Sequence, residues 1–142
     1  MKPLYVIISL IVVLAVLAGV GVYWYAFLRP HKNMMKSKPA YTLSSSQLLA
    51  EFSSDENAAF EKYAGQVIEV TGKIEDVKRD EKQTAIILDD KLFGISVYLD
   101  SSFIATNHKT VDDLNAGQTV TIRGQCDGML TDVVISRAVI IQ

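Results

Sequence analysis

The longest apolar stretch of the chain runs from Leu4 to Leu28 and contains no charged residue. A bilayer core of about 30 Å is spanned by roughly 20 mostly apolar helical residues, so this stretch is long enough to cross a membrane with some tilt. Tyr23, Trp24 and Tyr25 lie near its end, and such rings are enriched at membrane interfaces. The pattern predicts a transmembrane anchor over residues 1–28.

Two other interpretations of this stretch are a buried core helix and a cleaved signal peptide. A core helix of this length without a polar stripe would be unusual. A signal peptide has an apolar region of about 7–15 residues followed by a small-x-small cleavage site. Here the apolar region is longer, and Tyr25-Ala26-Phe27 is soon followed by Arg29-Pro30. These features favour an anchor that is not cleaved.

The charges leave the orientation of this anchor open. Lys2 precedes the apolar stretch and four Lys or Arg residues follow it within residues 29–38, so the positive-inside rule places the following domain in the cytoplasm. A short amino terminus, a long apolar run and a terminal aromatic cluster also suit an exported domain. Cys126 is the only cysteine, which excludes an internal disulfide and leaves the redox compartment undecided.

Residues 29–40 differ in composition from the apolar stretch before them. With His31 included they contain five basic side chains, two prolines and no acidic residue. This composition predicts a solvated juxtamembrane linker, in which each cation near anionic headgroups contributes on the order of 1 kcal/mol. We expect Arg29 to Lys38 to contact anionic lipid headgroups, and Met34 and Met35 to pack only near the surface.

Helical signals come first in the remaining chain. Ser44 and Gln47 have capping-box spacing before a short apolar face, which predicts the start of a helix. Asp55 can cap a second helical turn, and Gly65 can end it because glycine tolerates the left-handed conformation. These signals predict a helical lead-in over residues 44–64.

From Gln66 onward, apolar and polar residues alternate as they do in half-buried strands. The alternation predicts five strands: Gln66 to about Glu75, Thr84–Asp89, Gly94–Leu99, Gln118–Cys126 and Val133–Ile141. A charged turn over residues 78–82 separates the first two, and a short helix is expected around Val111 to Leu114. Gly72 and Gly124 lie inside the first and fourth strands, where the strands of a small barrel must coil tightly.

Three strands, a helical crossover and two further strands are the order of a five-stranded Greek-key barrel of the OB-fold type. An SH3-like or another small barrel has a similar strand count, but the crossover and the leading helix favour the OB-fold. We therefore predict an all-β fold with a leading helix. Its OB-fold domain covers residues 41–142, with the barrel over residues 66–141, and follows a single N-terminal transmembrane helix.

Two motifs resemble those of a known family. Residues 57–72, with the sequence NAAFEKYAGQVIEVTG, and residues 114–128, with the sequence LNAGQTVTIRGQCDG, are similar to two ordered motifs of the tRNA-anti-like OB-fold proteins. The resemblance covers roughly Leu43 to the end of the chain. It implies an OB-fold in a small bacterial protein that is membrane-anchored or a lipoprotein, and it favours the exported side.

The same resemblance says little about activity. The family name reflects likeness to a nucleic-acid-binding OB domain and implies no activity of its own. Many members have a second cysteine in the last strand, where this chain has Ala138. The resemblance therefore implies no disulfide for Cys126.

The predicted OB-fold domain is acidic although the whole chain has a net charge of only −2. All sixteen acidic residues lie within residues 41–142, together with nine of the fourteen Lys and Arg residues, which gives this part about −7. Non-specific nucleic-acid binding depends on a basic surface. Nucleic acid is therefore not an expected partner.

No residue pattern indicates catalysis, a metal site or a cofactor. His108 lies in a polar loop without a marked nucleophile, and Cys126 is expected to be a buried hydrophobe. The aspartate pairs 89–90 and 112–113 lack the spaced ligands of a calcium loop, and glycine-rich phosphate-binding loops are absent. We expect a protein that is not an enzyme and that has no cofactor or metal.

The usual OB-fold ligand face lies over the second and third strands and the loops that join strands one to two and four to five. Six candidate ligand residues follow from it: Lys73, Arg79, Ile87, Ser96, Tyr98 and Met129. Tyr98 is the only aromatic residue placed well there, whereas single-strand binders stack bases on several aromatics.

Three functions remain open at this point. The first is a membrane-anchored OB module that binds a protein or a cell-envelope component, which fits the anchor, the acidic charge and the absence of catalytic residues. The second is a nucleic-acid binder, which rests on fold analogy alone. The third is an enzyme with a site assembled across loops.

Overall fold

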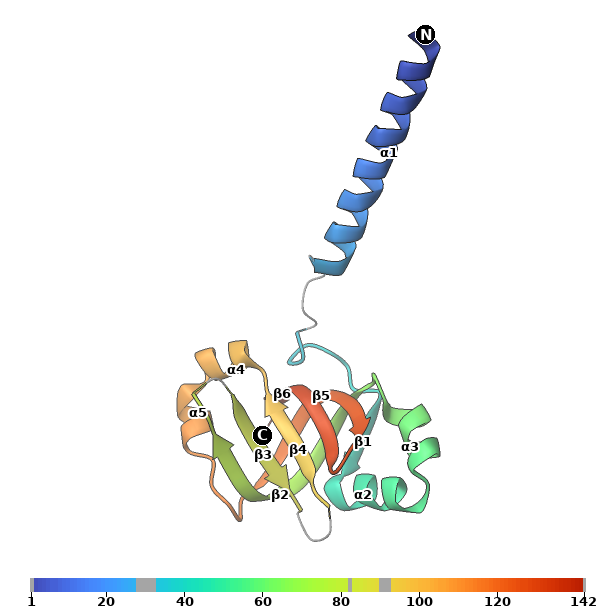
Figure 1. Cartoon of the computed structure of the whole chain (residues 1–142). Coiled ribbons are helices and arrows are strands. Elements are labelled where there is room, and N and C mark those ends of the chain that lie inside the picture. The colour runs from blue at the N-terminus through green and yellow to red at the C-terminus, as the bar shows by residue number, and fades with distance from the viewer. Residues whose placement is uncertain (1, 28–32, 82, 90–92, 142) are drawn as a thin grey trace. The chain divides into compact units, whose positions relative to one another are not determined.

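The computed structural model describes residues 2–27, 33–81, 83–89 and 93–141, and the chain forms two compact units, Met1–Lys32 and Asn33–Gln142. The first unit is helix α1 (Lys2–Phe27) (Figure 1). Its segment Tyr5–Ala26 has a mean hydropathy of 2.8 with 0% of it buried, so it is long and apolar enough to cross a membrane. The leading apolar helix is confirmed, and Leu28 lies outside the described residues.

The second unit contains a closed barrel of five strands. They are β2 (Val67–Arg79), β3 (Thr84–Leu88), β4 (Ile95–Leu99), β5 (Thr119–Met129) and β6 (Val133–Ile140). The strand order is β2-β3-β4-β6-β5, and pairing of β5 with β2 closes the barrel. β4 and β6 are parallel, and the other neighbours in the barrel are antiparallel. The predicted five-stranded OB-fold barrel is confirmed, although β2 continues through two residues that the sequence assigns to the charged turn.

A sixth strand, which the sequence does not predict, precedes the barrel. β1 (Tyr41–Ser44) lies parallel to the first half of β2, with Tyr41 opposite Ile68 and Leu43 opposite Val70. The other edge of this half of β2 pairs with β5. A four-residue strand is too short to show an alternation, and this is why its pattern is missed.

The two helices after β1 follow the predicted signals. α2 (Ser45–Ser54) begins after Ser44, whose hydroxyl accepts a hydrogen bond from the Gln47 amide. α3 (Glu56–Tyr63) begins after Asp55, whose carboxylate accepts from the Ala58 amide. Gly65 follows α3 with φ +75°, the left-handed conformation that glycine tolerates best. The predicted caps are confirmed.

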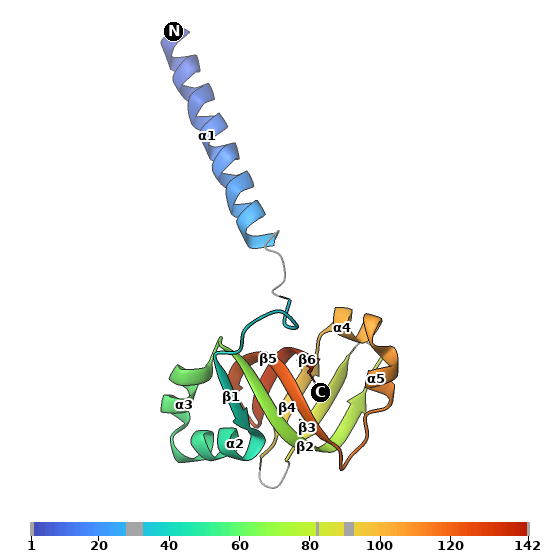
Figure 2. The same ribbon diagram turned by 180° about the vertical axis from the view of Figure 1, so that it is seen from behind.

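The crossover between β4 and β5 contains two short helices, α4 (Ser101–Thr106) and α5 (His108–Asp112). The predicted short helix around Val111 to Leu114 overlaps α5, whereas α4 is a second helix that the sequence does not predict. The helical region begins earlier because the Asp100 carboxylate accepts from the Ser102 and Phe103 amides, which caps a helix start. In both views the α2–α3 pair and the α4–α5 pair lie on opposite sides of the barrel (Figures 1 and 2).

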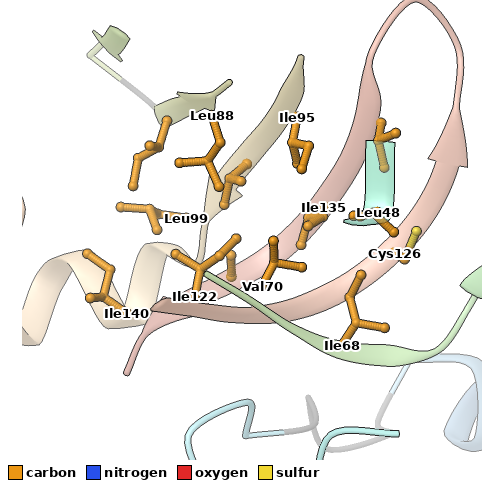
Figure 3. Packing of buried hydrophobic residues seen from close by; sticks show 14 of the residues in the cluster. Leu48, Ile68, Val70, Leu88, Ile95, Leu99, Ile122, Cys126, Ile135 and Ile140 are labelled. Atoms are coloured by element: carbon orange, nitrogen blue, oxygen red, sulfur yellow. The ribbon is translucent and has the colours of Figure 1, made fainter. Parts of the chain in front are cut away.

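The core fills the barrel and extends under α2. Figure 3 shows Leu88, Ile95, Ile122 and Ile135 directed into one interior, and each is 0% exposed. Leu48 and Phe52 of α2 belong to the same cluster, and every member of that cluster lies between Met34 and Ile140. The unit Asn33–Gln142 therefore contains the whole of this core.

The two strand glycines make room for neighbours. A Cβ atom on Gly124 would lie 2.6 Å from Ile135 Cγ2 and 2.9 Å from the Ser136 carbonyl oxygen, because β5 and β6 cross closely there. A Cβ atom on Gly72 would lie 2.6 Å from Ser45 Oγ. Gly124 thus matches the expectation of a tight barrel position, whereas Gly72 makes room for the start of α2.

The segment before β1 contacts the barrel through Met34, so the expectation that Met34 packs only near the surface is wrong, whereas Met35, Lys36 and Lys38 are exposed as expected of a solvated linker. Met34 is 3% exposed and belongs to the core. Arg123 Nη1 donates to the Met35 and Ser37 carbonyl oxygens at 3.0 and 3.1 Å, and Arg123 Nη2 lies 2.7 Å from Glu69 Oε2. The structural unit begins at Asn33 rather than at residue 41, and residues 29–32 of the predicted linker lie outside the described residues.

Candidate ligand-binding face

The strand register brings three of the six predicted ligand residues together. Ile87 on β3 lies opposite Ser96 on β4, and Tyr98 lies one pair further along, opposite Ala85. Their sequence neighbours Ile86 and Val97 are 0% exposed inside the barrel, so these three side chains point away from the interior. Ile87 and Ser96 are nevertheless only 8% exposed, and Tyr98 is half-buried. Because directly opposed residues of an antiparallel pair have Cβ atoms about 4.5–5.5 Å apart, the side chains of Ile87 and Ser96 are neighbours on this face.

Ser96 is already engaged by a carboxylate. The Ser96 hydroxyl donates to Asp132 Oδ2 at 2.9 Å, and the Gly94 amide donates to Asp132 Oδ1 at 3.2 Å. These two bonds hold a negative charge over the outward side of β4. Asp132 directly precedes β6 and is not among the residues that the sequence predicts for this face.

Arg79 has a different role from the predicted one. Its Nη2 donates to the carbonyl oxygens of Val111, Asp112 and Leu114, at 3.1, 3.3 and 2.8 Å. These carbonyls lie at the end of α5, where a helix leaves acceptors unpaired and where a cation is favoured. The guanidinium of Arg79 therefore holds the crossover to the barrel.

Lys73 and Met129 lie apart from the central residues. Lys73 is exposed on the half of β2 that pairs with β5, opposite Thr119. Met129 lies opposite Val133 at the end of β5 and packs partly against the core. The six predicted residues therefore do not form one cluster.

A row of outward positions continues from β3 and β4 across β6 and β5 to helix α3. Val134 is the register partner of both Ser96 and Gly128. Gly128 has φ +106°, and a Cβ atom on it would lie 2.6 Å from Phe60 Cε2, so the Phe60 ring lies against the Gly128 backbone. We call this set the outer row; its members are Phe60, Gly128, Val134, Ser96 and Ile87. Phe60 is exposed and Val134 is half-buried, whereas Gly128, Ser96 and Ile87 are buried.

Phe60 is the residue of this row that sequence reasoning misses. It is 49% exposed, whereas the core-facing stripe of α3 consists of Ala59 and Tyr63. An aromatic residue off the buried stripe of a short helix is the sequence signal that could have identified it. Leu130, at the turn between β5 and β6, is 90% exposed.

Carboxylates border the outer row, and we call Glu56, Asp127 and Asp132 its acidic rim. Glu56 lies one helical turn before Phe60, and Asp127 precedes Gly128. The cations of α3 and β6 are engaged elsewhere: Lys62 Nζ lies 2.8 Å from Glu51 Oε2, and Arg137 donates to Gln125. The Glu56 and Asp127 carboxylates have no ion-pair partner among the described residues.

The groups that could carry catalysis lie elsewhere. His108 is exposed at the start of α5. Cys126 is 0% exposed, and burial raises the pKa of its thiol. Across the described ranges, no three His, Cys, Asp or Glu side chains are grouped as they would be to hold a metal ion.

Comparison with known proteins agrees with this fold. A family model described as tRNA_anti-like matches residues 1–140, and no curated protein matches the chain. A proposed nucleic acid-binding lipoprotein from Klebsiella pneumoniae subsp. pneumoniae MGH 78578 is 20% identical with a TM-score of 0.59, over 80% of this chain and 100% of its own. This likeness shows the fold alone.

Two further structures are less similar. An OBody bound to hen egg-white lysozyme is 18% identical with a TM-score of 0.46, over 57% of this chain and 86% of its own. Asparaginyl-tRNA synthetase from Pyrococcus horikoshii is 16% identical with a TM-score of 0.42, over 57% of this chain and 21% of its own.

Proposed function

The chain belongs to the tRNA_anti-like family, and from this premise we propose that it is a single-pass membrane-anchored OB-fold module that binds a protein or another cell-envelope component. One observation carries the choice of ligand class. The exposed apolar side chains Phe60 and Leu130 lie beside the carboxylates of the acidic rim, and the described residues of this face form neither a basic groove nor a series of stacked aromatics.

The anchor in this proposal is α1. Its apolar span Tyr5–Ala26 supports membrane insertion, and the exposed Lys36 and Lys38 of the following unit suit anionic headgroups. The exported side is proposed from the family resemblance. Full-length protein should stay in the membrane fraction through an alkaline carbonate wash. Release of the full-length chain would contradict the anchor, and a mature chain that begins beyond Leu28 would identify a signal peptide instead.

A nucleic-acid ligand is the second candidate, favoured by the description of the Klebsiella neighbour as nucleic acid-binding. The charge of residues 41–142, about −7, opposes it, because phosphate binding needs a basic surface. Arg79, one of the expected cations, is used to hold α5. Stacking on aromatic side chains contributes about 1–3 kcal/mol per base, and Tyr98 is the only aromatic residue among the six predicted ligand residues.

Fluorescence anisotropy with labelled single-stranded DNA and RNA distinguishes the two candidates. We expect no binding tighter than about 10⁻⁴ M at physiological salt, the weak end of non-specific affinities. A micromolar, salt-sensitive isotherm that is lost in Tyr98→Ala or Lys78→Ala would support the nucleic-acid function instead. Arg79 is unsuitable for this test, since its replacement would also disturb the crossover.

We propose no catalytic role and no cofactor for this protein. The exposed His108 has no hydrogen-bonded nucleophile among the described residues, and the buried Cys126 thiol is inaccessible as a nucleophile. A binding function needs neither group.

A further inference from the structure

We propose that the exposed end of the outer row, together with Leu130 and the acidic rim, binds a polypeptide segment in which lysine or arginine residues lie next to large apolar side chains. This inference rests on the proposed binding-module function and specifies the chemistry of the partner. The contact would be centred on Phe60 and on the turn between β5 and β6, at one end of the usual OB-fold face.

The apolar part of this surface is centred on Phe60, whose ring is held in place by packing against β5. The Phe60 ring lies against a glycine with φ +106°, a position where a side chain would both strain the backbone and overlap the ring. This support holds a half-exposed aromatic ring in a defined place. Large aromatic side chains held in this way are typical anchors of protein interfaces.

Leu130 and Val134 extend the apolar surface from this ring. Leu130 is 90% exposed, and its amide donates to the Asp132 carbonyl oxygen at 3.1 Å, which holds the turn closed. Of the four large apolar side chains that are exposed among the described residues of Asn33–Gln142, Phe60 and Leu130 are the two that border the β5–β6 hairpin. The other two, Met35 and Tyr41, precede α2.

The rim specifies the charge of the partner. Glu56 and Asp127 are exposed carboxylates without an ion-pair partner in the described part of the chain. Asp132 is fixed over β4 by two donated hydrogen bonds. A phosphate backbone or an anionic lipid surface would be repelled by three such groups, whereas lysine or arginine beside apolar side chains would match both the charge and the apolar row.

The test uses the unit Asn33–Gln142, since the whole barrel core lies within it. Its first probe is a fluorescein-labelled octapeptide of alternating lysine and leucine, measured by anisotropy. The two comparison peptides alternate glutamate with leucine and lysine with serine. We expect binding of the lysine–leucine peptide only, because the other two lack either the charge or the apolar side chains.

Four variants locate the binding. Leu130→Ser should weaken binding by at least about fivefold, because it removes an apolar anchor. Asp127→Asn should weaken binding by about two- to fivefold, because it removes one exposed charge pair with the peptide. Met35→Ser, which removes another exposed apolar side chain, is the matched control for the first. Glu75→Gln, at an exposed position of β2, is the matched control for the second. Neither control should change the affinity.

Several outcomes would overturn the inference. They are binding of the glutamate–leucine peptide, equal losses in the test and control variants, and no binding of any peptide. Self-association of the unit in sedimentation experiments that Leu130→Ser abolishes would assign this surface to a second copy of the chain. A parallel titration with single-stranded DNA tests the proposed function separately from this inference. DNA binding contradicts the proposed function, whereas failure of the peptides with no DNA binding contradicts only this inference.

Discussion

Replacement of Met34 by alanine tests whether the chain before β1 is part of the folded unit. Met34 is 3% exposed within the core cluster, although it lies in a basic segment that the sequence predicts to be solvated. Large-to-small changes at buried Met residues cost about 2–5 kcal/mol when the surroundings cannot move away. Because the segment before β1 can detach while the barrel stays folded, the free energy of docking this segment sets an upper limit on how much Met34→Ala lowers the free energy of unfolding.

That docking free energy can be bounded from the contacts. Full burial of a Met side chain contributes about 1.5–3 kcal/mol, and each hydrogen bond from Arg123 to the two carbonyls contributes about 0.5–1.5 kcal/mol. The conformational entropy of an ordered segment opposes both terms. We therefore expect Met34→Ala to lower the free energy of unfolding by about 1–3 kcal/mol. One kcal/mol shifts the melting temperature of a domain of this size by about 4–8 °C.

Two measurements on the full chain in detergent separate detachment from global unfolding. Circular dichroism follows melting of the barrel, and limited trypsin digestion with mass spectrometry follows cleavage after Lys36, inside the segment. Met34→Ala should speed this cleavage at temperatures where the barrel is intact. Arg123→Gln should do the same, and the double variant should lose less than the sum of the two, because both side chains hold one segment.

Met35→Ala is the matched control, since Met35 is 51% exposed in the same segment. It should leave both the melting temperature and the cleavage rate close to those of the parent. If Met34→Ala behaves like Met35→Ala in both measurements, residues 33–40 form a solvated linker as the sequence predicts, and the structural boundary at Asn33 is wrong.

Three further predictions concern the barrel and its helices. Gly124→Ala should lower the free energy of unfolding more than Gly72→Ala in urea titrations, because the added Cβ meets the backbone of β6 in the first case and only the side chains of Ser45 and Asp89 in the second. Both valine variants should cost about 1–3 kcal/mol or more. Iodoacetamide should alkylate Cys126 only at the rate of unfolding, because the thiol is buried and its pKa is raised. Hydrogen bonds from Lys62 and Tyr63 hold the pKa of Glu51 below its ordinary 4.5. The Glu51 carboxylate therefore stabilises the fold above pH 4.5, and this stabilisation is lost as the pH falls through the lowered pKa. We expect Glu51→Gln to be less stable than the parent at pH 7 and to lose stability less steeply as the pH falls.

The features that the sequence predicts correctly depend on residues close together in the chain. The alternation from Gln66 onward identifies the strands because a barrel strand has one face inside and one outside. Ser44 and Asp55 identify the helix starts because a cap bonds to an amide two or three residues away. These local patterns predict the structure correctly because each depends only on residues a few positions apart, and not on how distant parts of the chain pack.

The features that the sequence misses depend on distant partners. Nothing near Met34 distinguishes it from Met35, yet one is buried by the barrel and the other is 51% exposed. Arg79 belongs to the charged turn that the sequence predicts and is the last residue of β2 in the structure, and only the folded crossover supplies the carbonyls that it binds. The outer row likewise joins Phe60 to Gly128 through the packing of α3 on β5, which no local pattern encodes.

The same distinction bears on the choice between the two candidate functions. The sequence offers four cations for a local basic groove near the predicted ligand face, Lys73, Lys78, Arg79 and Lys82, and acidic residues close to them in the chain are expected to neutralise it largely. Lys82 lies outside the described residues. In the structure Arg79 is bonded to the end of α5, and Lys73 lies on the half of β2 that pairs with β5. The carboxylates behave differently, since Asp132 is fixed on the outward face by the bonds that hold Ser96. Among the described residues, folding thus engages Arg79 elsewhere, places Lys73 on the other half of β2 and adds the Asp132 carboxylate to this face, which makes a phosphate ligand less favourable there than composition alone suggests.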